Sequence, residues 1–201
     1  MGDRYPIPAG EHRAQQEISR SRFIATVAPA ATIEDAQAFV ARMRAEFPDA
    51  THNCWAYVVG PPGSTGRVGM SDDGEPHGTA GRPMLTVLLH SGLGDVAAVV
   101  TRYYGGTKLG TGGLVRAYGG AVQHALESLP RAERVAWVDC VLTIGYGDVT
   151  VVQQLIAGHE GRVAEESYAA DVTYRVTLPD ARRDAFAAAV LDATRGQALV
   201  E

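Results

Sequence analysis

The sequence predicts an α+β protein made of two domains. Apolar residues alternate in some segments, as strands require, and recur every three or four positions in others, as helices require. The 201 residues are enough to form two modest hydrophobic cores. The pattern changes near residues 130–137, where Pro130 closes a long helical segment and a new alternating segment begins. The predicted domains are therefore residues 1–134 and 135–201.

In the first domain, residues 15–28 predict two strands joined by a turn at Arg20 and Ser21. A helix follows, with Thr32 as its N-cap and Asp35 completing a capping box, and Pro48 stops it. Residues 52–59 predict a strand. Residues 60–83, rich in turn formers, predict a long loop of the kind that is either functional or disordered. A short helix over residues 79–90, a strand over residues 96–104 and a helix over residues 113–129 complete the domain.

In the second domain, four apolar residues at alternating positions predict a strand over residues 138–144. A helix over residues 149–156, strands over residues 162–168 and 172–178, a helix capped by Asp180 and a last strand at residues 197–200 follow. The resulting order, βαββαβ, is that of the ferredoxin-like fold.

Composition and charge restrict the classes of function. Hydrophobic residues make up 46% and charged residues 20%, and no apolar run approaches the roughly 20 residues that span a bilayer. The polar N-terminal segment has no apolar stretch typical of a signal peptide, so a soluble cytoplasmic protein is expected. Cys54 and Cys140 are too few and too far apart to predict a disulfide framework or a zinc site.

Charge is distributed unevenly along the chain. Residues 1–136 hold 13 basic and 13 acidic residues, whereas residues 137–201 hold 5 basic and 10 acidic, so the net charge of −5 belongs to the second part. Of the 18 basic residues, Lys108 is the single lysine. Two explanations are open. The genome favours arginine codons and Lys108 is a chance exception, or position 108 needs a compact ammonium group instead of a planar guanidinium. Any nucleic-acid contact must come from a local basic patch, because the pI is only about 5.7.

The segment from Ser71 to Gly81 places three carboxylates within four residues, at Asp72, Asp73 and Glu75. Such carboxylates need a helix N-terminus, a basic partner or a cation. The spacing is not that of an EF-hand loop, so capping or pairing with arginines is favoured over metal binding. His52, Asp72, Asp73, Glu75 and His77 form the expected supporting acidic and polar cluster.

The segment from Thr101 to Tyr118 runs from a strand through a glycine-rich loop into a helix. Glycines allow a ligand to approach the backbone, and a helix N-terminus favours an anion, although tight packing also selects glycine. The basic and aromatic side chains around the loop suit phosphates and bases. The predicted phosphate or nucleic-acid site consists of Arg102, Tyr104, Lys108, Gly110, Gly112 and Arg116.

The sequence contains no convincing catalytic group, and no cofactor motif. It lacks the Walker A, dinucleotide-binding and nucleophile-elbow patterns. His52 and Cys54 alternate on one predicted strand and would face the same side, so a Cys–His pair is geometrically conceivable.

Four blocks of the sequence resemble the IMPACT family, in particular its bacterial two-domain members. They are SRFIA at 21–25, HNCWAY at 52–57, SDDGEPHGTAGRP at 71–83 and VVTRYYGGTKLGTGGLVRAY at 99–118. His77 stands where the family usually has serine, and Tyr104 where it usually has phenylalanine.

The resemblance implies a first domain similar to domain 2 of ribosomal protein S5 and a second similar to domain V of elongation factor G. It also implies contact with RNA or the ribosome, leaves room for a protein partner in translation control, and implies no established enzyme activity. Two alternatives stay open: an enzyme acting on a small phosphorylated substrate, and a protein-binding regulator without RNA contact.

Overall fold

The computed structural model describes residues 4–201 and separates into two compact units. One unit spans residues 5–133, and the other spans residues 134–201 together with Arg4. Residues 1–3, which open the polar N-terminal segment and the first predicted domain, lie outside the described residues. Both units mix helices and strands, so the predicted α+β class is confirmed at this level.

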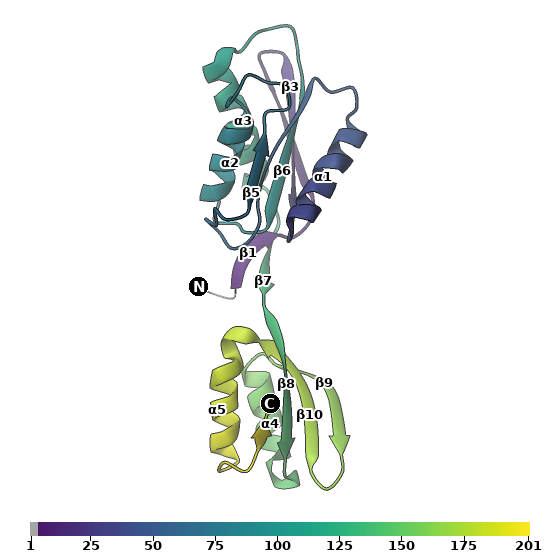
Figure 1. The fold of residues 1–201 in the computed structure, drawn as a ribbon, viewed down its shortest axis with the longest axis vertical. Coiled ribbons are helices and arrows are strands. Elements are labelled where there is room, and N and C mark those ends of the chain that lie inside the picture. Colours follow the sequence, from purple (N-terminus) through teal and green to yellow (C-terminus); the bar gives the residue numbers. More distant parts are fainter. Residues whose placement is uncertain (1–3) are drawn as a thin grey trace. The chain divides into compact units, whose positions relative to one another are not determined.

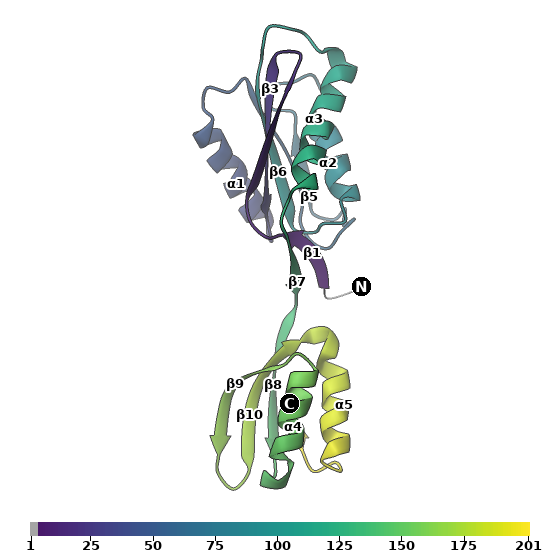
Figure 2. The same cartoon turned by 180° about the vertical axis from the view of Figure 1, so that it is seen from behind.

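The unit of residues 5–133 is a five-stranded antiparallel sheet between helices (Figure 1). The strand order is β2 (His12–Ile18), β3 (Ser21–Pro29), β6 (Val96–Tyr103), β4 (His52–Val58) and β5 (Val68–Ser71). Helix α1 (Ile33–Glu46) covers one face, and α2 (Gly81–His90) and α3 (Gly110–Glu127) cover the other (Figures 1 and 2). Strands β1 (Arg4–Pro8) and β7 (Arg131–Val135) form a separate two-stranded sheet.

This unit has buried apolar residues on both faces of its five-stranded sheet. The run from Val96 to Val100 is buried throughout, which is why it reads as a continuous apolar segment rather than an alternating one. On the α2–α3 face, the ring of Phe23 meets the ring of Tyr118 edge-on, with centroids 5.3 Å apart. On the α1 face, Phe39 and Met43 pack against the sheet.

Two local predictions in this unit are confirmed. Thr32 and Asp35 form the capping box of α1, with reciprocal hydrogen bonds of 3.0 Å. A turn between two strands is present as predicted, but it lies at Ser19 and Arg20, one residue before the predicted position. Both residues have positive φ, a backbone conformation common in tight turns.

The prediction of an uninterrupted loop over residues 60–83 is wrong, because β5 lies inside it and pairs with β4. Its sequence, VGMS, is short and contains glycine, so it gives a weak strand signal. Gly69 is needed there because a Cβ atom would lie 2.4 Å from Cζ of Tyr57 on the neighbouring strand.

The second unit has the predicted βαββαβ order. Its elements are β8 (Trp137–Ile144), α4 (Val149–Gly158), β9 (Arg162–Tyr168), β10 (Val172–Pro179), α5 (Arg183–Ala193) and β11 (Leu199–Val200). The sheet order is β11-β8-β10-β9, and α4 and α5 lie on one face of it (Figure 2). Leu142, Tyr174 and Phe186 are fully buried between helices and sheet.

The prediction that Asp180 caps the last helix is wrong. Asp180 begins a single 3₁₀ turn, and α5 begins three residues later without a side-chain cap. Within residues 4–201, no helix has both the length and the apolar character needed to cross a membrane.

Candidate functional site

The acidic segment and the glycine-rich segment lie side by side, as their opposite charges predicted. Arg102 lies near the end of strand β6, which ends at Tyr103, and Glu75 lies in the turn after β5. Nη1 of Arg102 donates to Oε1 of Glu75 over 2.5 Å, and the two side chains are 6% and 4% exposed. This ion pair therefore lies inside the unit and not on its surface.

Several further groups surround the Arg102–Glu75 pair. The hydroxyl of Tyr118, on α3, donates to the same Oε1 atom over 2.7 Å. Nη2 of Arg102 donates to Oγ of Ser21 over 3.3 Å, and Nε2 of His52 lies 3.9 Å from Glu75. Burial, reinforced by Cys54 and Glu75, raises the pKa of Tyr118 well above its ordinary value, so its hydroxyl stays a donor. We call Glu75, Arg102, Tyr118 and Ser21 the buried polar network, and the partly exposed His52 borders it.

Asp72 caps helix α2. Its two carboxylate oxygens accept hydrogen bonds from the backbone amides of Gly78, Ala80 and Gly81 over 2.8–3.0 Å. Burial raises the pKa of Asp72, but these amides together outweigh burial, and the pKa lies below its ordinary value. Capping of the following helix was one of the roles predicted for these carboxylates, and for Asp72 it is confirmed.

Asp73 and the two nearby histidines also have local roles. Asp73 accepts a hydrogen bond from Arg44 over 2.5 Å and from the backbone amide of Asn53 over 2.7 Å. Nδ1 of His52 lies 2.8 Å from the carbonyl oxygen of Asp73, and the exposed ring of His77 lies 3.8 Å from Asp72. Thus all three carboxylates of the segment are compensated by groups of the fold. Across residues 4–201, no three His, Cys, Asp or Glu side chains gather in a way that could hold a metal ion.

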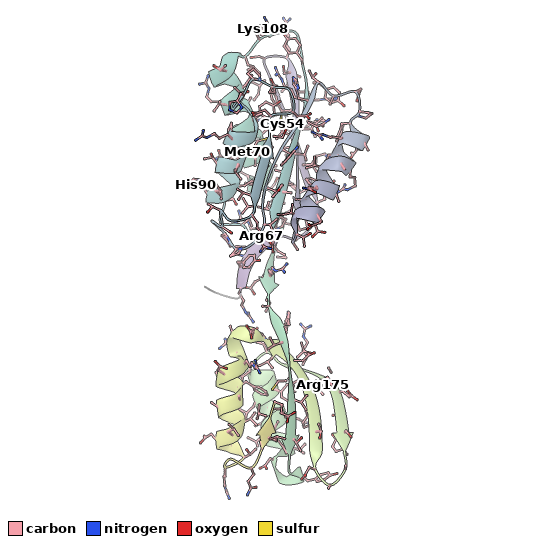
Figure 3. All side chains as sticks on the ribbon, in the orientation of Figure 1. Cys54, Arg67, Met70, His90, Lys108 and Arg175 are labelled. Carbon is pink, nitrogen blue, oxygen red and sulfur yellow. The ribbon has the colours of Figure 1, made fainter. Side chains whose placement is uncertain are left out.

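The expected phosphate-binding residues fall into three groups. Arg102 was expected to contact phosphate, but it is buried and its charge is balanced by Glu75. Tyr104, Lys108 and Gly110 lie around a cavity at the N-terminal end of α3, and Figure 3 labels Lys108 on the loop that leads into this helix. Arg116 lines a different depression, the groove between α2 and α3.

The α2–α3 groove has a volume of about 520 Å³. Arg82 and Arg116 line it from opposite helices, together with Gly119 and Gly120. Arg82 was not among the residues predicted from the sequence. The predicted helix over residues 79–90 was a usable signal, because it places Arg82 in the first turn of a helix.

The glycines of the loop serve different purposes. Gly105 packs against the β2–β3 turn, whereas Gly106 and Gly110 have φ of +88° and +69°. Gly112 has an ordinary φ, and a Cβ atom there would meet only Nη1 of Arg116, at 3.8 Å. Packing therefore does not require glycine at position 112, and its backbone is open to a ligand.

Cys54 belongs to the interior and forms no pair with His52 within the described residues. Its Sγ atom donates to the carbonyl oxygen of Asp72 over 2.9 Å. Burial raises the pKa of the Cys54 thiol to about 12. Cys140 is buried as well, and neither cysteine forms a disulfide.

We therefore expect the native protein to resist alkylation. Both thiols should stay unmodified by iodoacetamide at pH 8 over a period in which the unfolded chain reacts completely, since the thiolate is the nucleophile. Mass spectrometry of native and urea-unfolded samples measures this. Rapid labelling of Cys54 in the native protein would contradict the burial described here.

Both units of this α+β protein match known protein-family models. A model of the Impact N-terminal domain matches residues 19–126, and a model named domain of unknown function DUF1949 matches residues 142–197. The chain belongs to the IMPACT family.

Similar proteins come from several bacteria. The IMPACT family member YigZ of Escherichia coli K12 is 45% identical over 94% of this chain and 93% of its own length. YvyE of Bacillus subtilis is 36% identical over 94% of this chain and 85% of its own length. A crystal structure described as that of a hypothetical protein matches with a TM-score of 0.70 and 43% identity, covering 100% of this chain and 97% of the other.

Proposed function

We propose that this chain is a non-catalytic RNA- or ribosome-binding protein that acts in the cytoplasm in the regulation of translation. One observation carries the proposal. Arg82, Lys108 and Arg116 are exposed near the N-terminal ends of α2 and α3, and none of them forms an ion pair within residues 4–201.

The internal pairing of the acidic segment explains why these cations matter. Glu75 is paired with Arg102, Asp73 with Arg44, and Asp72 with the amides of α2. No carboxylate of this segment is left to neutralise Lys108 or Arg116. A chain with a net charge of −5 therefore presents a local positive surface, which is what attraction to phosphate requires.

Fold analogy supports the same proposal more weakly. We infer that the first unit has the fold of domain 2 of ribosomal protein S5, and that the second is ferredoxin-like, as in domain V of elongation factor G. The βαββαβ order and the sheet order β11-β8-β10-β9 support the second assignment. Folds of this kind carry many functions, so the exposed cations, and not the fold, are the main support.

Replacing Lys108 or Arg116 with alanine should weaken binding to many RNA sequences alike. Phosphates carry no sequence information, and each lost contact should reduce the slope of log affinity against log salt by roughly 0.7–0.9. The midpoint of thermal unfolding should barely change, because both side chains are exposed. Fluorescence anisotropy with structured RNA and with ribosomal subunits, at several salt concentrations, measures the effect.

Arg42→Ala is the control for net charge. Arg42 is an exposed arginine on α1, across the sheet from the site, where it pairs with Glu11 over 2.7 Å, and its removal changes the net charge equally. Equal losses for Arg42→Ala and Lys108→Ala would mean that net charge, not this surface, drives binding. If the wild-type protein has no salt-dependent affinity for RNA or ribosomes, the proposal fails. Turnover of phosphorylated substrates, or capture of a protein partner alone, would then support one of the alternative functions.

A further inference from the structure

A cavity of about 370 Å³ opens at the N-terminal end of α3. It falls within the range of roughly 300–1,000 Å³ that holds small organic ligands. Pro76, Leu109 and Leu114 provide apolar walls, and Glu75, Arg102, Tyr104 and Lys108 provide the polar and aromatic groups. Glu75 and Arg102 are buried and form the closed end, whereas Lys108 and Thr111 are exposed and form the mouth.

The closed end contains a buried donor without an acceptor. Nη1 and Nη2 of Arg102 have partners, but Nε has none within residues 4–201 and is shielded from solvent. Leaving a buried donor unpaired costs about 1–3 kcal/mol, so such groups call for a missing partner. Oε1 of Glu75 accepts two hydrogen bonds, and Oε2 accepts none in the described structure. A ligand at this end can therefore donate to Oε2 of Glu75, and it lies beside the guanidinium of Arg102.

The mouth suits an anion. Helix α3 has 18 residues, and no side chain in the described part of the chain caps its N-terminus. The amides of its first turn therefore have no side-chain acceptor, and they carry the positive end of the helix dipole. Lys108, which forms no ion pair within residues 4–201, adds an ammonium group beside them. An anionic group is excluded from the closed end, because it would meet the carboxylate of Glu75 there.

Tyr104 adds a flat surface between the two ends. Its side chain is 45% exposed, and the guanidinium of Arg102 lies 5.4 Å from the centre of its ring. A planar heterocycle can stack on such a ring, with a contribution of roughly 1–3 kcal/mol per base. Every nucleobase carries both a donor and an acceptor on its edge, which matches Glu75 and Arg102.

We propose that this cavity binds one nucleoside monophosphate unit, with its base at the closed end against Tyr104 and its phosphate at Lys108 and the first turn of α3. The unit is either a free nucleotide or the terminal nucleotide of an RNA. The RNA-borne form rests on the proposed function, whereas the free form does not.

Calorimetric titration of the full chain with AMP, adenosine and inorganic phosphate tests the proposal. AMP should bind saturably, at least about threefold more tightly than adenosine, and phosphate alone should bind more weakly than AMP. Thr111→Phe, which places a ring at the mouth, should weaken AMP binding by about tenfold or more. Thr86→Phe is the matched control, because Thr86 is also exposed on a helix but lines the α2–α3 groove, and AMP binding should be unchanged.

RNA with and without a terminal phosphate separates the two sources of the ligand. Tighter binding of AMP than of either RNA end assigns the site to a free nucleotide, and tighter binding of a terminal nucleotide assigns it to RNA. Absence of saturable AMP binding at about 10 mM, or equal loss in Thr111→Phe and Thr86→Phe, would overturn the proposal. Salt-dependent RNA binding that persists in Thr111→Phe would leave the proposed function standing without this cavity. AMP binding without RNA affinity would support this cavity and contradict the proposed function.

Discussion

Replacing Glu75 with alanine should lower the free energy of unfolding by about 3–5 kcal/mol, because the guanidinium of Arg102 would remain buried without a counter-charge. The two side chains are only 6% and 4% exposed, so water cannot replace the lost carboxylate easily. The hydroxyl of Tyr118 would lose its acceptor as well. Urea denaturation of the wild type and the variant, followed by circular dichroism, measures the difference.

A double variant separates the cost of an unpaired charge from the cost of lost packing. Glu75→Leu combined with Arg102→Met removes both charges while keeping apolar volume, and such replacements of buried pairs are often nearly neutral. The double variant should therefore be more stable than Glu75→Ala by at least about 2 kcal/mol. If Glu75→Ala unfolds at the same urea concentration as the wild type, the pair is not buried in solution as described here.

The sequence predicted most elements of the fold, because their apolar patterns were long and their ends carried explicit signals. The capping box of Thr32 and Asp35 fixed the start of α1, and the alternating residues of β8 and β10 fixed the second sheet. Strand β5 could not be predicted, since four residues that include Gly69 give little periodicity and the strand is recognisable only through its pairing with Tyr57 and its neighbours on β4.

The site was predicted in position but not in detail. Opposite charges in the two segments indicated that they would lie together, and the Arg102–Glu75 pair confirms it. Sequence could not show which arginine turns inward, because that depends on register. Arg102 lies near the end of β6, opposite Phe23 on one neighbouring strand and His52 on the other. Arg116, almost two turns into α3, lines the groove instead.

Packing against the β2–β3 turn is what requires glycine at position 105. A Cβ atom there would lie 1.8 Å from the carbonyl oxygen and 2.1 Å from the carbonyl carbon of Arg20. Both are backbone atoms, so no side-chain rotation can relieve the clash. The backbone amide of Gly105 also donates to Oγ of Ser21 over 3.3 Å, the atom that accepts from Arg102. The loop that carries Lys108 is thus tied to the buried polar network at this point.

Gly105→Ala should therefore destabilise the protein by about 3 kcal/mol, at the upper end of the usual cost of overpacking, because two backbone segments must separate. Gly106→Ala is the matched control: its φ of +88° is strained for alanine, but nothing lies within 4 Å of the added carbon. We expect Gly106→Ala to lower the free energy of unfolding by only about 1–2 kcal/mol.

Gly105→Ala should also weaken RNA binding more than Gly106→Ala, since it displaces the start of the Lys108 loop. Urea denaturation and anisotropy on the same samples measure both effects. Equal stabilities of the two variants would show that the contact with Arg20 does not hold the loop.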